Sequence, residues 1–356
     1  MSKIIVGMSG GVDSAVAAYL LKIAGHDVTG VTLRTWLSSA GKESRCCEIE
    51  DARKVAWELD IPYYVVNCLA EFEKYVTEPF VDDYIKGRTP NPCTRCNRYV
   101  KWDKMIEAAR VMGADYIATG HYANVVKTDE GRYTFKKAIH TKKDQTYMLY
   151  ALKQAQVAST LMPLGGLTKD QVRVIAAKAG LPVASKADSQ EICFVSRGMD
   201  YTDYIEETAR SEIQGPGNFV DENGIVLGIH QGIIHYTVGQ RKGLGLALGY
   251  PAYVKEIRAD RNEVVIAKEE DIYSKVIICK DVNLMSVASI DRPIHCSVKI
   301  RYQHQGQSAL VEMIDEDSVR ISFDEEVKAP APGQAAVFYD EEDRIIGGGI
   351  ISSVEY

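Results

Sequence analysis

Long hydrophobic runs are the first feature that this sequence of 356 residues lacks. No apolar stretch approaches the roughly 20 residues that a helix needs to cross a bilayer. The N-terminus leads straight into a predicted strand and a glycine loop, without the apolar core and small-residue cleavage site of a signal peptide. We therefore expect a cytoplasmic protein with no membrane partner.

The sequence also has few cysteines and no excess of positive charge. Eight cysteines in a chain of this length are too few for a disulfide scaffold. In a reducing compartment they are expected to be buried apolar residues, metal ligands or catalytic thiols. The net charge of -7 and the pI near 5.6 argue against indiscriminate binding of nucleic acid, although they allow a local basic track.

The N-terminal part of the chain alternates predicted strands with predicted helices. This alternation is typical of an α/β fold with a doubly wound parallel sheet covered on both faces. Strands are predicted over Lys3–Met8, Val28–Leu33, Tyr63–Val66 and Tyr116–Thr119. Helices are predicted over Ser14–Lys22, Glu48–Leu59, Val76–Ile85 and Val100–Met112.

The pattern changes after about residue 205. Glycine is dense from Gly215 to Gly249, and short alternating runs punctuated by turn residues occur from Val254 onward, which is typical of a small β-barrel. The length also favours more than one domain. We expect a catalytic α/β domain over 1–204, a small glycine-rich central domain over 205–274 and a C-terminal β-barrel over 275–356.

A glycine- and serine-rich loop joins the first predicted strand to the first predicted helix. Glycines let the backbone turn tightly and point its N–H groups at an anion, and the helix N-terminus adds the positive end of its dipole. Asp13 can hold Mg²⁺ or cap the helix. We expect the phosphates of a nucleotide to bind to Gly7, Met8, Ser9, Gly10, Gly11, Val12, Asp13 and Ser14.

This loop differs from a Walker loop, because the lysine that reaches the β and γ phosphates is absent. The hexapeptide Ser-Gly-Gly-Val-Asp-Ser over Ser9–Ser14 instead resembles the loop of the ATP-pyrophosphatase superfamily. The resemblance implies cleavage of ATP between its α and β phosphates. A substrate oxygen takes the adenylyl group, and pyrophosphate leaves.

Three further segments narrow the resemblance. A double-proline loop with a C-x-x-C lies over Gly87–Asn97, another cysteine lies in Asp188–Phe194, and a glycine-rich motif covers His235–Gly245. With the phosphate loop, they resemble the tRNA-specific 2-thiouridylase family over nearly the whole chain. The family implies an adenine nucleotide alpha hydrolase-like sheet. It also implies ATP-dependent 2-thiolation of the wobble uridine of tRNA, with release of AMP and pyrophosphate.

The family resemblance gives two cysteines distinct roles. Sulfur insertion at a carbonyl needs an activated oxygen and a sulfur nucleophile. Cys193 corresponds to the cysteine that carries a persulfide delivered by a sulfur donor protein, and Cys96 to the nucleophile that releases the sulfur. A Cys96–Cys193 disulfide is then left by thiol–disulfide exchange. Free sulfide is the alternative sulfur donor, for a route through a cluster. Cys96 is predicted to come after a helix-breaking loop and to precede the helix Val100–Met112, whose dipole favours a thiolate.

Cys93 departs from the family pattern, in which many members carry Asp at this position. Cys93, Cys96 and Cys193 make a set of three thiols, which could leave one iron of a [4Fe-4S] cluster open to sulfide. The sequence does not decide between a persulfide and a cluster, and zinc is a third alternative. Cys46 and Cys47 are as compatible with bystanders as with sulfur acceptors. Three remaining cysteines in apolar contexts are expected in the core: Cys68, Cys279 and Cys296.

The resemblance also implies contacts with the nucleotide and with tRNA. Leu33 and Gly120 lie at the ends of strands on the carboxyl edge of the sheet and correspond to residues that frame the adenine. The loop with Lys143, Asp144 and Gln145 would contact phosphates and bases of tRNA. The pair Arg301 and Tyr302 would contact a phosphate and a splayed base. The residues that correspond to tRNA contacts are His121, Lys143, Asp144, Gln145, Arg301, Tyr302, Gln303 and Gln334.

Two other classes of protein compete with this interpretation. Amidotransferase-type synthetases and argininosuccinate synthase use the same kind of loop, but their chemistry gives no reason for Cys96 and Cys193 together. A non-catalytic RNA-binding or iron–sulfur protein would not need a pyrophosphatase loop. Consumption of ATP with release of pyrophosphate in the presence of tRNA would separate these classes.

Overall fold

The computed structural model describes residues 1–37, 48–187, 192–195, 198–209 and 211–356. The chain forms two compact units. The first contains Met1–Val76, Cys93–Gly198 and Glu342–Ile346, and the second contains Thr77–Pro92, Met199–Glu341 and Gly347–Tyr356. Over the described residues, none of the helices has both the length and the apolar character that a membrane span requires.

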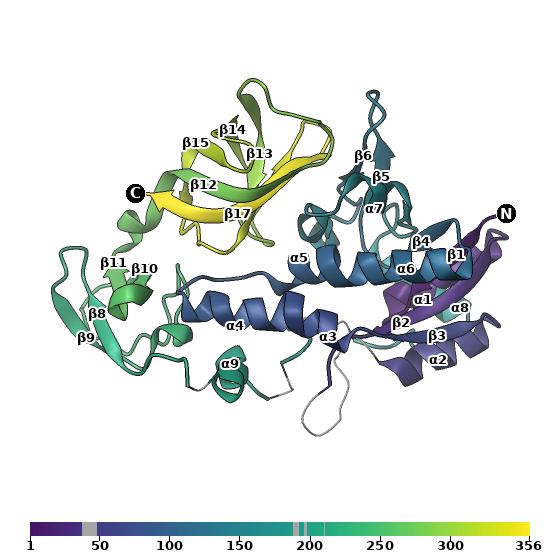
Figure 1. Cartoon of the computed structure of the whole chain (residues 1–356), viewed down its shortest axis with the longest axis horizontal. Coiled ribbons are helices and arrows are strands. Elements are labelled where there is room, and N and C mark those ends of the chain that lie inside the picture. The colour runs from purple at the N-terminus through teal and green to yellow at the C-terminus, as the bar shows by residue number, and fades with distance from the viewer. Residues whose placement is uncertain (38–47, 188–191, 196–197, 210) are drawn as a thin grey trace. The chain divides into compact units, whose positions relative to one another are not determined.

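A parallel five-stranded sheet is the centre of the first unit (Figure 1). Its strand order is β3-β2-β1-β4-β7. The strands are β1 (Lys3–Gly7), β2 (Asp27–Arg34), β3 (Tyr63–Asn67), β4 (Tyr116–Ala118) and β7 (Thr160–Leu161). The order reverses direction between β1 and β4, so the switch point, where open α/β sheets bind ligands, lies at the carboxyl ends of these two strands.

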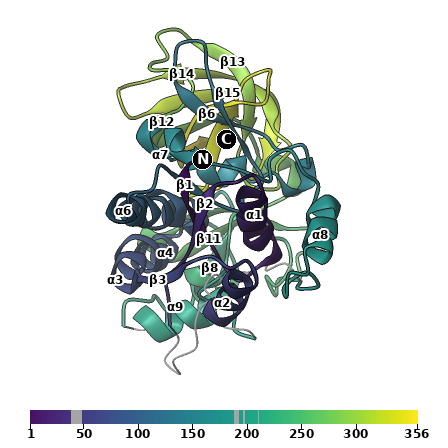
Figure 2. The ribbon, with the colours of Figure 1, turned by 90° about the vertical axis from the view of Figure 1, so that its right-hand side faces the viewer.

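Helices cover both faces of this sheet, as the alternation of predicted elements indicated. Ile4 and Val6 share a core with the helices α1 (Val12–Ile23), α2 (Ile49–Glu58) and α8 (Lys169–Lys178). A Cβ on Gly7 would instead meet Met105 of α6 (Trp102–Met112), which therefore lies on the opposite face. Figure 2 shows α1 and α8 on one side of β1 and β2, and α6 on the other. The doubly wound sheet is confirmed.

The C-x-x-C segment lies inside a helix, which corrects the prediction of a loop before Val100. The helical stretch runs through α5 (Pro92–Cys96), the π-helical turn η2 (Asn97–Lys101) and α6. Proline is compatible with the first position of a helix, because that position has no intrahelical partner for an N–H. Pro92 therefore begins a helix and does not break one. A second π-helical turn, η1 (Glu73–Thr77), separates α3 (Leu69–Phe72) from α4 (Glu78–Ile85).

Short elements complete the first unit between β4 and α8. They are β5 (Asn124–Lys127), β6 (Tyr133–Lys136), η3 (Thr141–Lys143), η4 (Thr146–Leu149) and α7 (Gln154–Ala158). The strands β5 and β6 pair as an antiparallel hairpin. The segment with η3 and η4 is the loop for which the sequence predicts tRNA contacts.

The second unit contains the helices α4 and α9 (Tyr201–Ala209) and two β-structures. The first is a four-stranded sheet in the order β10-β11-β8-β9. Its elements are β8 (Gly217–Val220), β9 (Val226–His230), η5 (Ile233–His235), β10 (Tyr253–Arg258), η6 (Ala259–Arg261) and β11 (Glu263–Ala267). The alternating run at Glu263 thus belongs to this sheet and lies outside the barrel.

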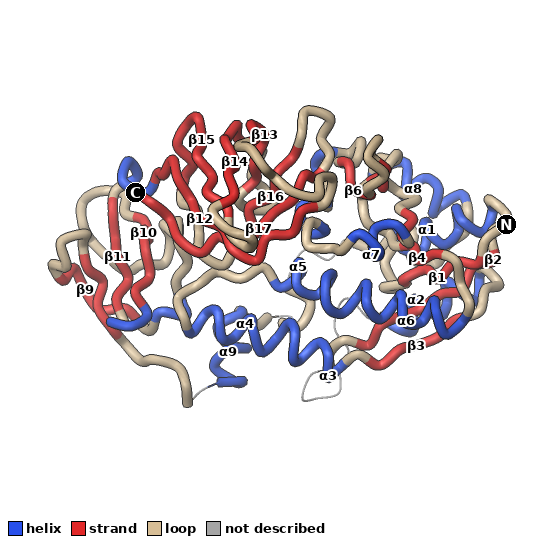
Figure 3. The backbone as a smooth tube through the Cα atoms, turned by 45° about the horizontal axis from the view of Figure 1, so that its top comes forward, coloured by secondary structure: helices blue, strands red, loops and turns tan. Residues whose placement is uncertain are grey.

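The second β-structure is the predicted C-terminal barrel, and it is closed in the order β12-β15-β14-β13-β16-β17 (Figure 3). It comes after η7 (Glu269–Ile272) and contains β12 (Tyr273–Leu284), β13 (Ile294–Lys299), β14 (Gln307–Met313), β15 (Val319–Lys328), β16 (Ala335–Tyr339) and β17 (Ile345–Glu355). Cys279 and Cys296 are buried in barrel strands, and Cys68 is buried after β3. Burial raises the pKa of the Cys296 thiol to about 12, so it is an inert core residue, as expected.

Candidate active site

The glycine–serine loop turns from β1 into α1 at the switch point. Ser14 Oγ accepts a hydrogen bond from Ser9 N at 3.1 Å and donates one to Gly11 O at 3.1 Å, so the loop closes on its own hydroxyl. Gly10 has a φ of 78°, a left-handed conformation that favours glycine. Gly11 is the N-cap of α1 and provides no side-chain cap. Of the two alternatives given for Asp13, the helix cap is not formed, because Asp13 lies within the first turn of the helix.

Gly120 lies directly against this loop. A Cβ on Gly120 would stand 2.5 Å from Ser14 N and 2.6 Å from the carbonyl carbon of Asp13. Only glycine allows the turn after β4 to approach so closely. Leu33 is buried at the end of β2. Leu33, the glycine–serine loop and Gly120 therefore lie at the carboxyl ends of the neighbouring strands β2, β1 and β4, at one edge of the sheet.

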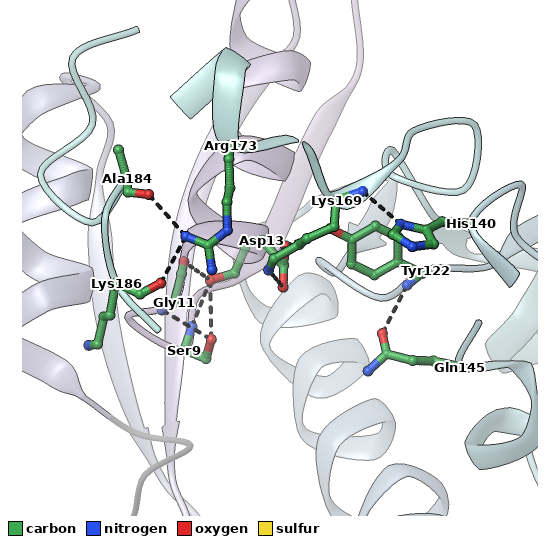
Figure 4. A network of polar contacts seen from close by, with 11 residues as sticks. Ser9, Gly11, Asp13, Tyr122, His140, Gln145, Lys169, Arg173, Ala184 and Lys186 are labelled. Carbon is green, nitrogen blue, oxygen red and sulfur yellow. Dashed lines mark hydrogen bonds and ion pairs between the residues drawn. The ribbon is translucent and has the colours of Figure 1, made fainter. Parts of the chain in front are cut away.

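Asp13 is held by two residues that the sequence did not reveal (Figure 4). Lys169 Nζ lies 2.8 Å from each carboxylate oxygen of Asp13, and the hydroxyl of Tyr122 donates to Oδ1 at 2.8 Å. Lys169 is the first residue of α8 and is only 6% exposed. Its backbone N–H donates to His140 Nδ1 at 2.8 Å. No local motif marks Lys169, because 156 residues separate it from Asp13.

Two more cationic side chains support the loop from α8 and the segment after it. Lys186 Nζ donates to Gly10 O at 3.0 Å and also pairs with Glu48 and Asp51. The hydrogen bond that Lys186 Nζ donates to the Asp51 carboxylate lowers the pKa of that carboxyl. Arg173 Nη1 donates to the backbone oxygen of Lys186 at 3.1 Å, as Figure 4 shows. Cationic side chains from distant segments thus lie around a loop that has no lysine of its own, and Lys169 and Lys186 are paired there with carboxylates.

The two cysteines of the C-x-x-C share one face of a helix. Cys93 is the second residue of α5 and is exposed, whereas Cys96 lies three residues later and is buried. The next residue, Asn97, donates from Nδ2 to Met148 O in η4 at 2.9 Å. This bond ties the cysteine helix to the loop Thr141–Leu149.

Cys193 is half-buried in the short described segment 192–195. The neighbouring Phe194 is buried and packs edge-to-face on Phe72 of α3, with ring centroids 5.7 Å apart. The preceding residues 188–191 of the same motif and the pair Cys46 and Cys47 lie outside the described residues.

The three-thiol arrangement that an iron–sulfur cluster needs is not formed by the described parts of the chain. Among these residues, no three His, Cys, Asp or Glu side chains converge so that they could hold a metal ion. Cys93, Cys96 and Cys193 are all described, so in this structure they do not fit a [4Fe-4S] cluster or a zinc ion.

His121 is in the neutral form near neutral pH. Burial, together with the nearby charge of Lys101, lowers the pKa of its imidazole to about 3. Its Nδ1 lies 2.8 Å from the hydroxyl of Thr119, and its ring is 5.6 Å from that of Trp102. His121 can therefore offer a ring surface or a neutral hydrogen bond, but it does not act as a cation for phosphate.

Two polar side chains of the loop Thr141–Leu149 make hydrogen bonds within the first unit. Asp144 is buried, and its oxygens accept hydrogen bonds from Ala138 N at 3.0 Å and from the Thr146 hydroxyl at 2.7 Å. The side chain of Gln145 accepts from Tyr122 N at 3.0 Å. In this structure both side chains shape the loop, whereas the half-buried Lys143 keeps partial access to solvent.

The tRNA positions predicted in the second unit are of two kinds. Arg301 and Gln303 are exposed and Tyr302 is half-buried in the turn after β13. Gln334 instead points at its own chain, and its Nε2 donates to Thr89 O at 2.8 Å. A hydrogen bond from Thr89 N to Pro332 O completes this attachment of the Gly87–Pro90 loop.

A parallel sheet, a glycine–serine loop without a Walker lysine and surrounding cations define a nucleotide-binding protein of the ATP-pyrophosphatase loop class. Three family models match the chain. They are described as tRNA methyl transferase HUP domain at residues 2–197, tRNA methyl transferase PRC-barrel domain at residues 202–268 and aminomethyltransferase beta-barrel domain at residues 274–351.

Relatives with assigned functions resemble the chain over its length. The tRNA-specific 2-thiouridylase MnmA of Lachnoclostridium phytofermentans is 51% identical over 99% of this chain and 99% of its own length. The protein of the same name from Acetivibrio thermocellus is 50% identical over 98% of this chain and 99% of its own. The chain belongs to the tRNA-specific 2-thiouridylase family, which confirms the resemblance found in the motifs.

The chain also resembles part of a solved structure. The U34-tRNA thiolase NcsA from Methanococcus maripaludis with its [4Fe-4S] cluster is 19% identical. The match covers 59% of this chain and 67% of that one, with a TM-score of 0.36. A likeness at this level has no bearing on the mechanism of the present protein.

Proposed function

We propose that this protein catalyses ATP-dependent 2-thiolation of the wobble uridine of tRNA, in the cytoplasm, with release of AMP and pyrophosphate. The observation that carries the proposal is the phosphate loop at the N-terminus of α1, with Gly120 against it and the Asp13–Lys169 pair beside it. This site belongs to the same compact unit as Cys96 and Cys193. We also propose the domain division 1–204, 205–274 and 275–356.

The first step of the proposed reaction is adenylation. The C2 oxygen of the uridine attacks the α-phosphorus of ATP, an O–P bond forms, and the bond to the β-phosphate breaks as pyrophosphate leaves. Backbone N–H groups of Gly7–Ser14 and the dipole of α1 hold the phosphates. Leu33 and Gly120 frame the adenine. Mg²⁺ would neutralise phosphate charge, and Asp13 is the carboxylate of the loop that could bind it.

The second step is sulfur transfer. The Cys193 thiolate attacks the terminal sulfur of a donor persulfide, whose S–S bond breaks as the donor leaves as a thiol. The terminal sulfur of the Cys193 persulfide then attacks C2 while the C2–O bond to AMP breaks. The Cys96 thiolate then attacks the Sγ of Cys193. The S–S bond to the transferred sulfur breaks, which leaves 2-thiouridine and a Cys96–Cys193 disulfide. Two electrons from an external thiol restore the cysteines.

The position of Cys96 supports its role as an attacking thiolate. It lies in the second turn of the helix that starts at Pro92, near the helix end whose N–H groups favour negative charge. Cys93 lies nearer to that end and is exposed, so it is proposed as an accessory thiol. We favour the persulfide route because the described thiols do not converge on a metal site.

We propose that tRNA contacts both units. In the first unit, His121, Lys143, Asp144 and Gln145 line or shape the surface beside the cysteine helix. In the second, Arg301, Tyr302 and Gln303 offer phosphate contact and an aromatic face for a base. Gln334 acts through the Gly87–Pro90 loop, which it attaches to the barrel.

The test is thiolation of tRNA by purified protein with ATP and a persulfide donor. Cys96→Ser and Cys193→Ser should each abolish thiolation while tRNA affinity stays within about twofold, because neither change removes a contact with phosphate. Thiolation at the wild-type rate in either variant would contradict the assigned roles. Asp13→Ala should abolish release of pyrophosphate.

The route of sulfur is tested by anaerobic purification with analysis of iron, sulfide and visible absorption. The persulfide route predicts protein without iron that thiolates tRNA, and a Cys93→Ala variant that retains activity. A stoichiometric four-iron cluster that is lost together with thiolation in Cys93→Ala would replace the persulfide route by a cluster mechanism.

A further inference from the structure

The second unit contains a cavity of about 600 Å³ that none of the assigned catalytic residues lines. Three parts of this unit form it: the N-terminus of α9, the turn directly after η5, and the barrel residues Arg301 and Lys328. The first part of the glycine-rich motif His235–Gly245, up to Gln240, thus forms one wall of a concave site.

The turn in this wall is rigid. Gln240 N donates to Thr237 O at 3.0 Å, and Gly239 has a φ of 87°, which together describe a type II turn. The side chain of Gln240 accepts a hydrogen bond from Thr237 N at 3.0 Å and closes the turn a second time. A Cβ on Gly239 would lie 2.9 Å from the Cβ of Ala329. The glycine is therefore required both by conformation and by space, and the wall is held against the barrel.

The charged side chains of the cavity are fixed by neighbours. Arg301 Nη1 donates to Lys328 O at 3.0 Å, which orients a guanidinium that carries five donors. The ammonium of Lys328 lies 4.8 Å from the ring centroid of Tyr253 and pairs with Glu269. His235 Nε2 lies 3.4 Å from a carboxylate oxygen of Glu206. Arg301 thus remains the principal anion-binding side chain.

The opposite wall supplies an acceptor and a ring. Asp200 accepts a hydrogen bond from Tyr201 N at 2.6 Å at the start of α9. The ring of Tyr201 is stacked on that of Tyr84, with centroids 4.6 Å apart and planes inclined by 29°. The cavity therefore combines a guanidinium, a carboxylate, a hydroxyl at Thr237 and an aromatic wall. Such a mixture suits a ligand that has both an anionic group and hydrogen-bond donors.

We propose that this cavity binds one nucleotide of the tRNA substrate, unstacked from its neighbours and distinct from the uridine that is thiolated. Its phosphate accepts hydrogen bonds from the Arg301 guanidinium. Its base or ribose donates a hydrogen bond to the Asp200 carboxylate and contacts Thr237. The volume lies within the range of pockets for small molecules, and proteins read single-stranded RNA through bases that are splayed out in this way. The inference rests on the proposed function, which supplies both tRNA as the substrate and Arg301 as a contact for its phosphate.

The first test is photo-crosslinking of full-length protein to tRNA. p-Benzoylphenylalanine is placed at Thr202, which lines the cavity, or at Thr208, an exposed position on the same helix that does not. The expected result is a crosslink to a single nucleotide other than the wobble uridine from position 202 and none from 208. Absence of a crosslink at 202, equal crosslinking at both positions, or a crosslink to the wobble uridine would overturn the proposal.

The second test is the affinity for tRNA of Thr237→Val, with Thr208→Val as its matched control. Loss of the Thr237 hydroxyl should raise the Kd for tRNA about three- to tenfold, with ATP affinity and kcat at saturating tRNA unchanged. An unchanged Kd would overturn the assignment of Thr237. If wild-type protein thiolates tRNA but neither the crosslink nor the change in Kd is observed, only the assignment of the cavity is refuted. If wild-type protein neither binds nor thiolates tRNA, the proposed function is refuted.

A free mononucleotide has the same chemistry as the proposed ligand. Calorimetric titration of ATP-saturated protein with AMP, GMP, CMP and UMP separates the two sources. Binding that Thr237→Val abolishes, combined with an unchanged Kd for tRNA, would assign the cavity to a free nucleotide and overturn the tRNA proposal. Absence of such binding supports it.

Discussion

The contact between Gly120 and the phosphate loop gives a sharp prediction. In Gly120→Ala the new methyl group would lie 2.5 Å from Ser14 N, a backbone atom that cannot rotate away as a side chain can. The loop or the turn after β4 must retreat by about 0.9 Å to reach the 3.4 Å of an ordinary contact. Overpacking of this size costs about 1–3 kcal/mol of unfolding free energy. A displacement near 1 Å of groups that position a reacting phosphate lowers the rate by about a hundredfold.

The matched control is Gly166→Ala. A Cβ on Gly166 meets no atom within 4 Å, and its φ is not left-handed. The assays are pyrophosphate release in the presence of tRNA and urea unfolding. We expect Gly120→Ala to lose about a hundredfold in kcat/KM for ATP, and Gly166→Ala to match the wild type. Release of pyrophosphate by Gly120→Ala close to the wild-type rate would refute the close approach of the two segments.

Three further predictions concern single contacts. Lys169→Met should lower kcat for pyrophosphate release at least tenfold and the unfolding free energy by about 1–3 kcal/mol. The reason is that Asp13 loses its paired cation in a partly exposed site. An unchanged rate of pyrophosphate release would exclude a role for the pair in the reaction. Because the pKa of His121 is about 3 when folded and about 6.5 when unfolded, the unfolded chain binds the additional proton and stability falls as pH drops below 6.5. His121→Asn should remove about 2 kcal/mol of the loss in unfolding free energy between about pH 7.5 and pH 5, measured by urea denaturation, and parallel pH profiles for the two proteins would contradict the buried neutral ring. Gln334→Glu should cost about 1–3 kcal/mol in the same assay, since a carboxylate would face the Thr89 carbonyl without a donor, whereas a variant as stable as the wild type would show that the contact is absent in solution.

The positive charge of the nucleotide site illustrates what a local motif omits. The loop Ser9–Ser14 has no lysine. Lys169 and Lys186 contact it from α8 and from the segment after it, and Arg173 of α8 bonds to the backbone of Lys186. Neither the spacing of these residues nor their immediate surroundings marks them. They become recognisable only once α8 packs beside α1 in the same core.

The helix around the cysteines shows where a local pattern misleads. Two prolines and an asparagine over residues 90–92 suggest a loop up to Val100, yet Pro92 is the first residue of α5. A proline that can break a helix can equally start one, and the outcome depends on the residues after it and on the contacts that hold the preceding turn. Here the turn is attached through hydrogen bonds of Thr89 with Gln334 and Pro332, more than 240 residues away in the sequence.

Elements that have a local signal in the amino-acid sequence could be predicted without the structure. The glycine–serine loop follows from residues that allow a tight turn between a strand and a helix. The doubly wound sheet follows from the alternation of strand and helix patterns, and the barrel from short strands with alternating apolar residues. Tertiary structure alone decided which distant side chains meet. It placed Lys169 on Asp13, buried Asp144 within its own loop, neutralised His121 and closed a cavity around Arg301. These outcomes depend on burial and on contacts between segments far apart in the chain, which no local pattern of residues encodes.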